Sequence, residues 1–146
     1  MDNELYSFLK NYAEEQHIRM FFEYERVDPD QPSFSYGKRR FVSINEHWQF
    51  PQEIPFQLAH EISHILNGDK GMNLFATYAV SSAEEAAAND RAFKLIFKFC
   101  DLHDLYYSSV TQFMDYFGIP CYLEEAAERA FREYYGCLYQ DSWCEI

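Results

Sequence analysis

The chain has 146 residues, of which 48% are hydrophobic and 19% aromatic, which excludes an intrinsically disordered protein and predicts one domain over residues 1–146. No apolar stretch is long enough to span a membrane, and residues 1–4 lack the basic and apolar segments of a signal peptide, so we expect a cytoplasmic protein without a membrane partner. The formal net charge is −12, and the segment from Asp101 onward carries nine acidic residues against two arginines; we therefore expect no direct nucleic-acid binding and a basic protein as partner.

The first part of the chain predicts a helix followed by a small sheet. Apolar residues recur at helical spacing over residues 2–16, and Asp2 or Asn3 can serve as the N-cap. Three short segments with the signals of β-strands and a tight turn predict a small antiparallel sheet, built from residues 18–24, 34–36 and 40–44.

A metal-binding motif follows the predicted sheet. Residues 60–64 read His-Glu-Ile-Ser-His, the H-E-x-x-H pattern. His60 and His64 lie one turn apart on the same face of a helix, so both imidazoles can bind a single Zn²⁺. Glu61 follows the first histidine and can act as the general base toward a water whose pKa a zinc ion lowers to about 7. This pattern predicts a zinc-dependent peptidase.

The neighbouring residues are those of a buried helix. Pro55 fits the first helical turn, where a missing N–H costs nothing, and Gly68 can adopt the left-handed conformation that ends a helix. Apolar residues surround the two histidines, and burying imidazoles and a carboxylate is costly unless something satisfies them. The alternative is a helix whose polar stripe faces solvent, with no metal.

The third zinc ligand is expected from the Ala-rich segment 81–93, which should be helical. Glu85 and Asn89 are four residues apart and share a face, so Glu85 can bind the zinc while Asn89 hydrogen-bonds a ligand histidine. A serine at the start of the segment can instead form a capping box with either glutamate, and Glu84 remains the alternative ligand.

The remaining segments add few candidates. Residues 69–80 are predicted to form a loop, in which Tyr78 can stabilise a developing oxyanion or, as loop aromatics more often do, simply cover the core. His103 lies among acidic residues and is better explained as a surface histidine than as a second catalytic one. Gly136 is expected to end the last helix. Three further helices are predicted, over residues 83–99, 108–117 and 123–135.

From about residue 18 to 125 the chain resembles the ImmA/IrrE family of metallopeptidases. The resemblance rests on the H-E-x-x-H motif, the helical Glu-rich segment, the expected hairpin before the motif, and residues 118–120, which read Gly-Ile-Pro. The family typically carries H-E-L-G-H and then E-x-E-A-N-x-F-A. Here Ser63 stands where the family often has Gly. With Asn89 aligned to the family Asn, Glu85 matches the first acid, whereas Ala87 replaces the second acid and Arg91 the aromatic residue.

The resemblance implies a zinc metallo-endopeptidase that cleaves a helix-turn-helix repressor, a basic DNA-binding protein, of a phage or mobile element. The expected fold is α+β, with a small antiparallel sheet packed on the zinc helix and further helices around it. A second hypothesis is a catalytically silent antirepressor that binds a regulatory protein without cutting it. The departures from the family's E-x-E-A-N segment favour that hypothesis, and the presence of Glu61 argues against it.

Overall fold

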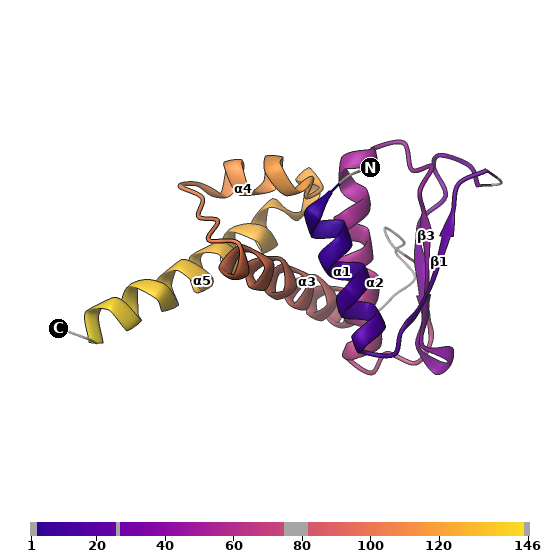
Figure 1. The fold of residues 1–146 in the computed structure, drawn as a ribbon, viewed down its shortest axis with the longest axis horizontal. Helices are drawn as coiled ribbons and strands as arrows, with labels where there is room; N and C mark the ends of the chain where they lie inside the picture. Colours follow the sequence, from indigo (N-terminus) through magenta and orange to yellow (C-terminus); the bar gives the residue numbers. More distant parts are fainter. Residues whose placement is uncertain (1–2, 26, 75–81, 145–146) are drawn as a thin grey trace.

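The computed structural model describes residues 3–25, 27–74 and 82–144 of the chain (Figure 1). The α+β class is confirmed. These residues form five α-helices: α1 (Glu4–Glu15), α2 (Ile54–Leu66), α3 (Ser82–Leu102), α4 (Val110–Phe117) and α5 (Glu124–Cys144). They also form four short strands: β1 (Arg19–Glu23), β2 (Phe34–Tyr36), β3 (Phe41–Asn45) and β4 (Met72–Leu74). In this part of the chain no helix combines the length and apolar character needed to cross a membrane.

The four strands form a mixed sheet in the order β1-β3-β2-β4. The predicted hairpin is confirmed, because β2 and β3 pair antiparallel. The expectation of an entirely antiparallel sheet is wrong, because β1 pairs with β3 in parallel register. The physical reason is that the chain passes from β1 to β2 without pairing them, and the hairpin then brings β3 back beside β1 in the same direction.

The segment after α2 also differs from the prediction. Residues 69–80 were expected to be a loop, but β4 lies within them and extends the sheet antiparallel to β2. Three residues are too few for a clear alternating pattern, so the sequence carries little signal for this strand. Tyr78 lies outside the described residues.

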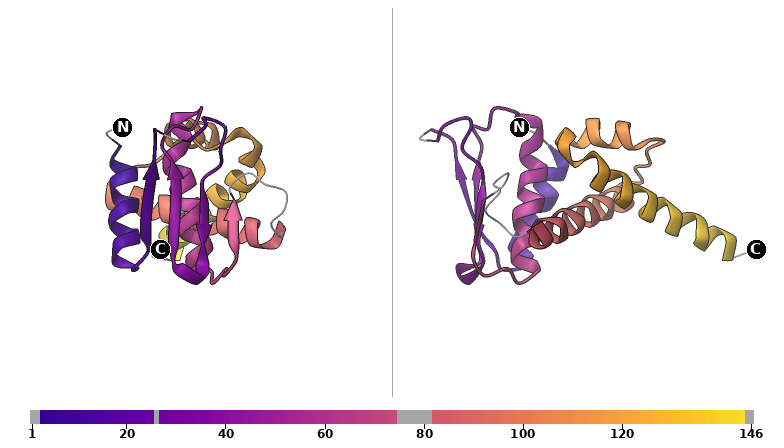
Figure 2. Two further views of the ribbon diagram at one scale, coloured as in Figure 1. Left: turned by 90° about the vertical axis from the view of Figure 1, so that its right-hand side faces the viewer. Right: turned by 180° about the vertical axis from the view of Figure 1, so that it is seen from behind.

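The helices all lie on one face of the sheet among the described elements (Figure 2). Side chains alternate between the two faces of a strand, and the buried residues Val42 and Ile44 of β3 point toward the helices. The first helix begins where predicted, since the side chain of Asn3 accepts a hydrogen bond from the backbone N–H of Tyr6 at 3.0 Å.

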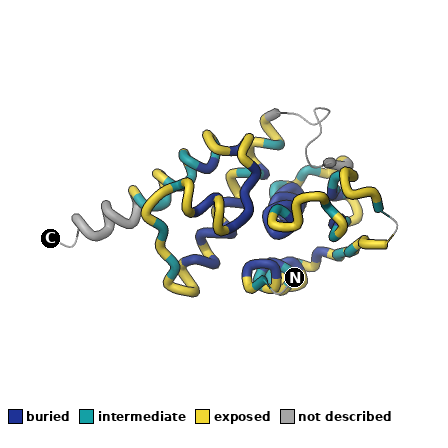
Figure 3. The backbone as a smooth tube through the Cα atoms, turned by 90° about the horizontal axis from the view of Figure 1, so that it is seen from above, coloured by how far each residue is buried: buried dark blue, intermediate teal, exposed yellow. Residues whose placement is uncertain are grey.

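Helix α2 is the centre of the molecule. It packs against α1, α3 and the sheet, and every residue from Ile54 to Ile65 is buried (Figure 3). Pro55 lies in its first turn, and Gly68 follows its end with φ of +83°, as the sequence predicts. The alternative in which the polar side chains of this helix face solvent is wrong, because His60 and His64 have no exposed surface.

The last two helices lie at the end of the molecule remote from the sheet, where α5 packs against α3 and α4 (Figure 1). Helix α4 begins after Ser109, whose hydroxyl accepts a hydrogen bond from the N–H of Gln112 at 3.2 Å. Helix α5 continues through Gly136 to Cys144, so the expectation that Gly136 ends it is wrong. A single glycine inside a helix costs only about 1 kcal/mol relative to alanine, which its other contacts can offset.

Candidate metal centre

Two helices bring together the residues of the H-E-x-x-H motif and a downstream glutamate. His60 and His64 project from successive turns of α2, and Glu85 projects from the first turns of α3. Each residue offers one nitrogen or oxygen atom to a group in which all atoms lie within 4.8 Å of one another. Glu84, the alternative ligand, is exposed at the surface. The competing capping interaction involves serine side chains outside the described part of the chain.

The distances within the triad are short and similar. The Nε2 atoms of His60 and His64 are 3.1 Å apart. One carboxylate oxygen of Glu85 lies 2.9 Å from Nε2 of His64, and the other lies 3.1 Å from Nε2 of His60. Nitrogen and oxygen ligands about 2.0–2.1 Å from a tetrahedral zinc ion are about 3.3 Å from one another. The observed separations therefore fit a shared cation to within a few tenths of an ångström.

The opposite nitrogen of each imidazole is held by an oxygen. Nδ1 of His60 lies 2.8 Å from Oδ1 of Asn89, and Nδ1 of His64 lies 2.9 Å from Oδ2 of Asp69. Amide and carboxylate oxygens only accept hydrogen bonds, so each Nδ1 carries a hydrogen and donates it. In a neutral imidazole this leaves the lone pair on Nε2, the atom that faces the triad.

The centre of the triad consequently contains only acceptors when both imidazoles are neutral. Two Nε2 lone pairs and the two oxygens of Glu85 meet there, although buried acceptors normally face a donor or a cation. A proton on His64 or a metal ion can supply the positive charge. Three ligand atoms of types that zinc prefers, held in a buried site, make the metal ion a good chemical fit.

The proton-binding properties of the triad reflect the same arrangement. Burial lowers the pKa of His64, but hydrogen bonds to Glu85 and Asp69 outweigh it and raise the pKa to about 9. Burial raises the pKa of Glu85, but its close contacts with His60 and His64 outweigh it and bring the pKa to about 2. The carboxylate is thus held ionised and ready to pair with a positive charge.

Glu61 is the second unusual feature of the site. Its side chain is completely buried, and no donor in the described chain hydrogen-bonds either carboxylate oxygen. Burial raises the pKa of Glu61 well above its usual value, while the charge of His64 and the proximity of the Ser35 hydroxyl, which does not reach hydrogen-bonding geometry, oppose the rise. The hydroxyl of Ser35 in β2 is likewise buried without a hydrogen-bond partner. Such groups cost about 1–3 kcal/mol each, so they are expected where a water or a ligand binds.

Asp69 is the residue of the site that the sequence did not reveal. The sequence indicates only a helix stop there, whereas the turn at Gly68 brings the Asp69 carboxylate back to His64. The hairpin holds this turn from the other side, since a Cβ on Gly37 would meet the carbonyl oxygen of Asp69 at 1.8 Å. The available signal was an acidic residue shortly after the second histidine. His103, the other candidate, is exposed and lies apart from the triad, 3.9 Å from Glu4.

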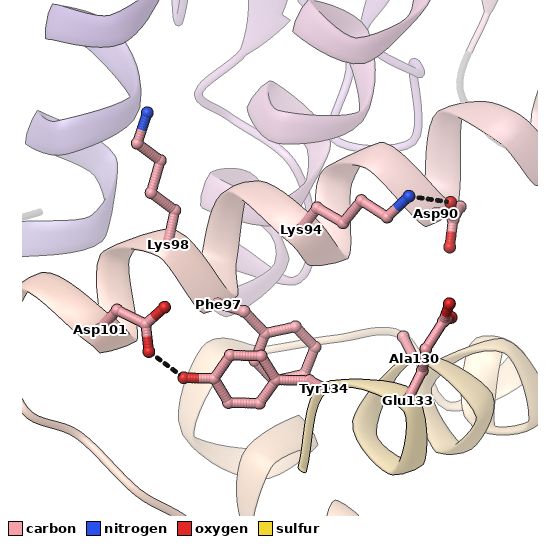
Figure 4. Close-up of a pocket in the computed structure, with 8 residues that line it drawn as sticks. All are labelled: Asp90, Lys94, Phe97, Lys98, Asp101, Ala130, Glu133 and Tyr134. Atoms are coloured by element: carbon pink, nitrogen blue, oxygen red, sulfur yellow. Dashed lines mark hydrogen bonds and ion pairs between the residues drawn. The ribbon is translucent and has the colours of Figure 1, made fainter. Parts of the chain in front are cut away.

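A separate cavity of about 320 Å³ lies between α3 and α5 (Figure 4). The rings of Phe97 and Tyr134 stack at its base with centroids 4.2 Å apart, and the Tyr134 hydroxyl donates a hydrogen bond to Asp101. On its rim, Lys94 pairs with Asp90 at 3.1 Å. Because these polar groups already pair with one another, this cavity is a weaker candidate for chemistry than the triad.

Comparisons with protein-family models, curated proteins and solved structures found no match to this chain. Assignment of the site therefore rests on its own geometry, a buried His-His-Glu triad on two helices that is consistent with an H-E-x-x-H metal site.

Proposed function

We propose that this protein is a zinc-dependent metallo-endopeptidase. The observation that carries the proposal is the buried convergence of His60, His64 and Glu85 beside Glu61, a buried carboxylate without a hydrogen-bond partner in the described chain. A structural metal site needs ligands only, and often four of them. Three ligands and an adjacent buried carboxylate are the composition of a hydrolytic site.

Each residue has a distinct role in this proposal. His60, His64 and Glu85 would hold the ion, while Asn89 and Asp69 orient the two imidazole rings. A zinc ion in such a site supplies Lewis acidity toward a carbonyl oxygen and lowers the pKa of water. The Glu61 carboxylate then accepts the proton of the attacking water and passes it to the leaving amine.

The proposed substrate is a basic DNA-binding regulator of the helix-turn-helix type, encountered in the cytoplasm. Two observations support this substrate: the resemblance of the motif segments to the ImmA/IrrE family and the negative charge of helices α4 and α5. Acidic side chains are exposed on α4 and α5, at Asp115, Glu124, Glu125 and Glu133. A surface of this sign attracts basic proteins at long range.

The test compares wild-type protein with Glu61→Gln and with Glu84→Gln, an exposed control one residue from the proposed ligand. Each is expressed in bacterial cells, its zinc content is measured by mass spectrometry, and new protein N-termini in the lysate are sequenced. We expect about one zinc per chain in all three proteins. New N-termini should appear with the wild type and with Glu84→Gln, and be absent with Glu61→Gln.

Two outcomes would overturn the proposal. Purified wild-type protein without stoichiometric zinc would exclude a metallopeptidase. The second outcome is a Glu61→Gln variant that captures the regulator and inactivates it as fully as the wild type does. That result would favour the catalytically silent antirepressor, because binding without cleavage does not require this carboxylate.

A further inference from the structure

No helix of the described chain covers the outer face of the sheet (Figure 2), and that face carries aromatic residues. By strand alternation, Phe21, Phe34, Tyr36 and Phe41 point away from the helices. Phe21 is 47% exposed, and the other three are partly exposed. Contiguous exposed aromatic surface on a folded protein commonly marks a binding site.

These four rings form one cluster centred on Phe41. The ring centroid of Phe41 lies 5.5 Å from Phe21, 6.1 Å from Phe34 and 5.8 Å from Tyr36. The cluster therefore extends across three neighbouring strands. Its rings pack edge-to-face or tilted against one another, which holds them close to the sheet.

Positive charge gathers at one end of the same sheet. The η1 turn (Gly37–Arg39), the start of β1 and the turn before β4 meet there through backbone hydrogen bonds, from Arg19 to Arg40 at 2.9 Å and from Lys38 to Lys70 at 3.1 Å. Arg19 pairs with Phe41 in the β1–β3 register, so the charged end adjoins the aromatic cluster. Five exposed cations make up this basic end: Arg19, Lys38, Arg39, Arg40 and Lys70.

None of the five forms an ion pair within 4.0 Å with a carboxylate of the described residues. The guanidinium groups of Arg19 and Arg40 donate instead to backbone carbonyl oxygens, at 3.2 Å and 2.7 Å, which positions them without neutralising their charge. The nearby Asp69 carboxylate is bonded to His64, and Glu23 lies at the opposite end of β1. Even with Asp69 and with Glu14 and Glu15, which precede Gln16 at the end of α1, cations outnumber carboxylates by five to three at this end of the sheet.

We propose that the aromatic cluster and the basic end together bind single-stranded nucleic acid. Phosphates would lie along the five cations, and unstacked bases would lie on the rings around Phe41. Single-stranded nucleic acids are commonly bound in this way, on an open sheet face where aromatic rings stack with bases and a basic border contacts the backbone. The proposal goes beyond the peptidase activity and does not depend on the metal site.

Other polyanions explain the surface less completely. An acidic protein segment would use the cations but has no need of an exposed aromatic cluster. An anionic membrane would use both, but membrane-binding aromatics must enter the lipid interface. Here the rings pack edge-to-face or tilted against Phe41, and three of the four are only partly exposed, so they can contact bases laid on the sheet but do not protrude as an anchor in lipid would.

The net charge of the chain does not exclude this binding. At physiological salt, electrostatic interactions are screened over about 8 Å. The acidic helices α4 and α5 lie on the opposite side of α2 from the sheet, so their charge is largely screened at the basic end (Figure 1). The expectation of no nucleic-acid binding followed from the acidic end of the chain, and this proposal departs from that expectation at the opposite end.

The experiment is a titration of full-length protein into a fluorescein-labelled 20-nucleotide oligothymidylate, followed by fluorescence anisotropy. Binding at 50 mM salt is expected, and affinity should fall about a hundredfold by 200 mM if five phosphates are neutralised. A duplex of the same length should bind more weakly, because its bases are not available for stacking.

Two pairs of variants separate the contributions of charge and stacking. Lys38→Glu/Arg39→Glu should weaken binding about tenfold or more, whereas Arg129→Glu/Arg132→Glu on α5 reverses the same number of charges and should have little effect. Phe21→Ala should weaken binding roughly tenfold without changing the salt dependence. Phe50→Ala is its control, because Phe50 is 46% exposed but is not part of the cluster.

Several outcomes would overturn the proposal. These are no anisotropy change at low salt, equal losses in both charge-reversal variants, or duplex binding as tight as single-strand binding. Binding of phosphatidylserine vesicles or polyglutamate with no binding of the oligonucleotide would assign the surface to a membrane or an acidic protein. Circular dichroism and zinc content should match the wild type in every variant, which excludes misfolding as the cause of lost binding.

Discussion

Helix α3 makes two junctions of opposite character. Near its start, Glu85 and Asn89 meet the histidines of α2, and the polar atoms at the centre of that junction are all acceptors when the histidines are neutral. Near its end, Phe97 and Asp101 meet Tyr134 of α5, and the Tyr134 hydroxyl and the Asp101 carboxylate there pair with each other. Polar atoms that pair within the chain need no further group. Converging acceptors, in contrast, repel one another unless a proton or a metal ion binds between them.

The largest expected effect is loss of metal at the α2–α3 junction. His64→Ala should reduce bound zinc from about one per chain to none, because it removes one of the three proposed ligands and leaves Asp69 without its partner. His103→Ala, an exposed control, should keep its zinc. Inductively coupled plasma mass spectrometry of the purified proteins measures the zinc content per chain. Zinc retained by His64→Ala would mean that the α2–α3 junction does not hold the metal.

A smaller effect is expected from the residues that orient the imidazoles. Asp69→Ala and Asn89→Ala should each weaken zinc binding about 10- to 100-fold while leaving some bound metal, because all three proposed ligands remain. Competition with a fluorescent zinc chelator gives the affinities. Asp90→Ala is the matched control on α3, since Asp90 is exposed and pairs only with Lys94 among the described residues. An unchanged affinity in Asp69→Ala would mean that this contact does not support the metal site.

The smallest effect is expected at the α3–α5 junction. Tyr134→Phe removes the hydrogen bond to Asp101 and keeps the stacked ring, so it should lower the free energy of unfolding by about 1 kcal/mol or less. Urea denaturation measures this change, and zinc affinity should equal that of the wild type. A large loss of zinc in this variant would show that the two junctions are coupled through α3.

The part of the site that follows helical periodicity could be predicted from the sequence. His60 and His64 are four residues apart on α2, and Glu85 and Asn89 are four apart on α3, so each pair shares a face wherever the helices lie. The choice of Glu85 over Glu84 needed the structure, because adjacent residues on a helix point about 100° apart and only packing selects one. Asp69 depends on a turn, whose direction local pattern does not specify.

Local sequence signals predicted less of the sheet and of the last helix. The hairpin has a turn signal between its strands, but the parallel pairing of β1 with β3 depends on contacts distant in the chain. Gly136 carries a helix-ending signal that α5 overrides. The basic end of the sheet joins cations from three separate segments, so net charge and composition obscure it.

The separation of 21 residues between His64 and Glu85 has a mechanical consequence. An ion held by both would act as a reversible cross-link that closes this loop and fastens α3 to α2. A covalent link across a loop of similar length restricts the unfolded chain by about 3 kcal/mol. Gain and release of the ion would therefore tighten and loosen the α2–α3 pair, and amide hydrogen exchange in the first turns of α3 would slow and quicken accordingly.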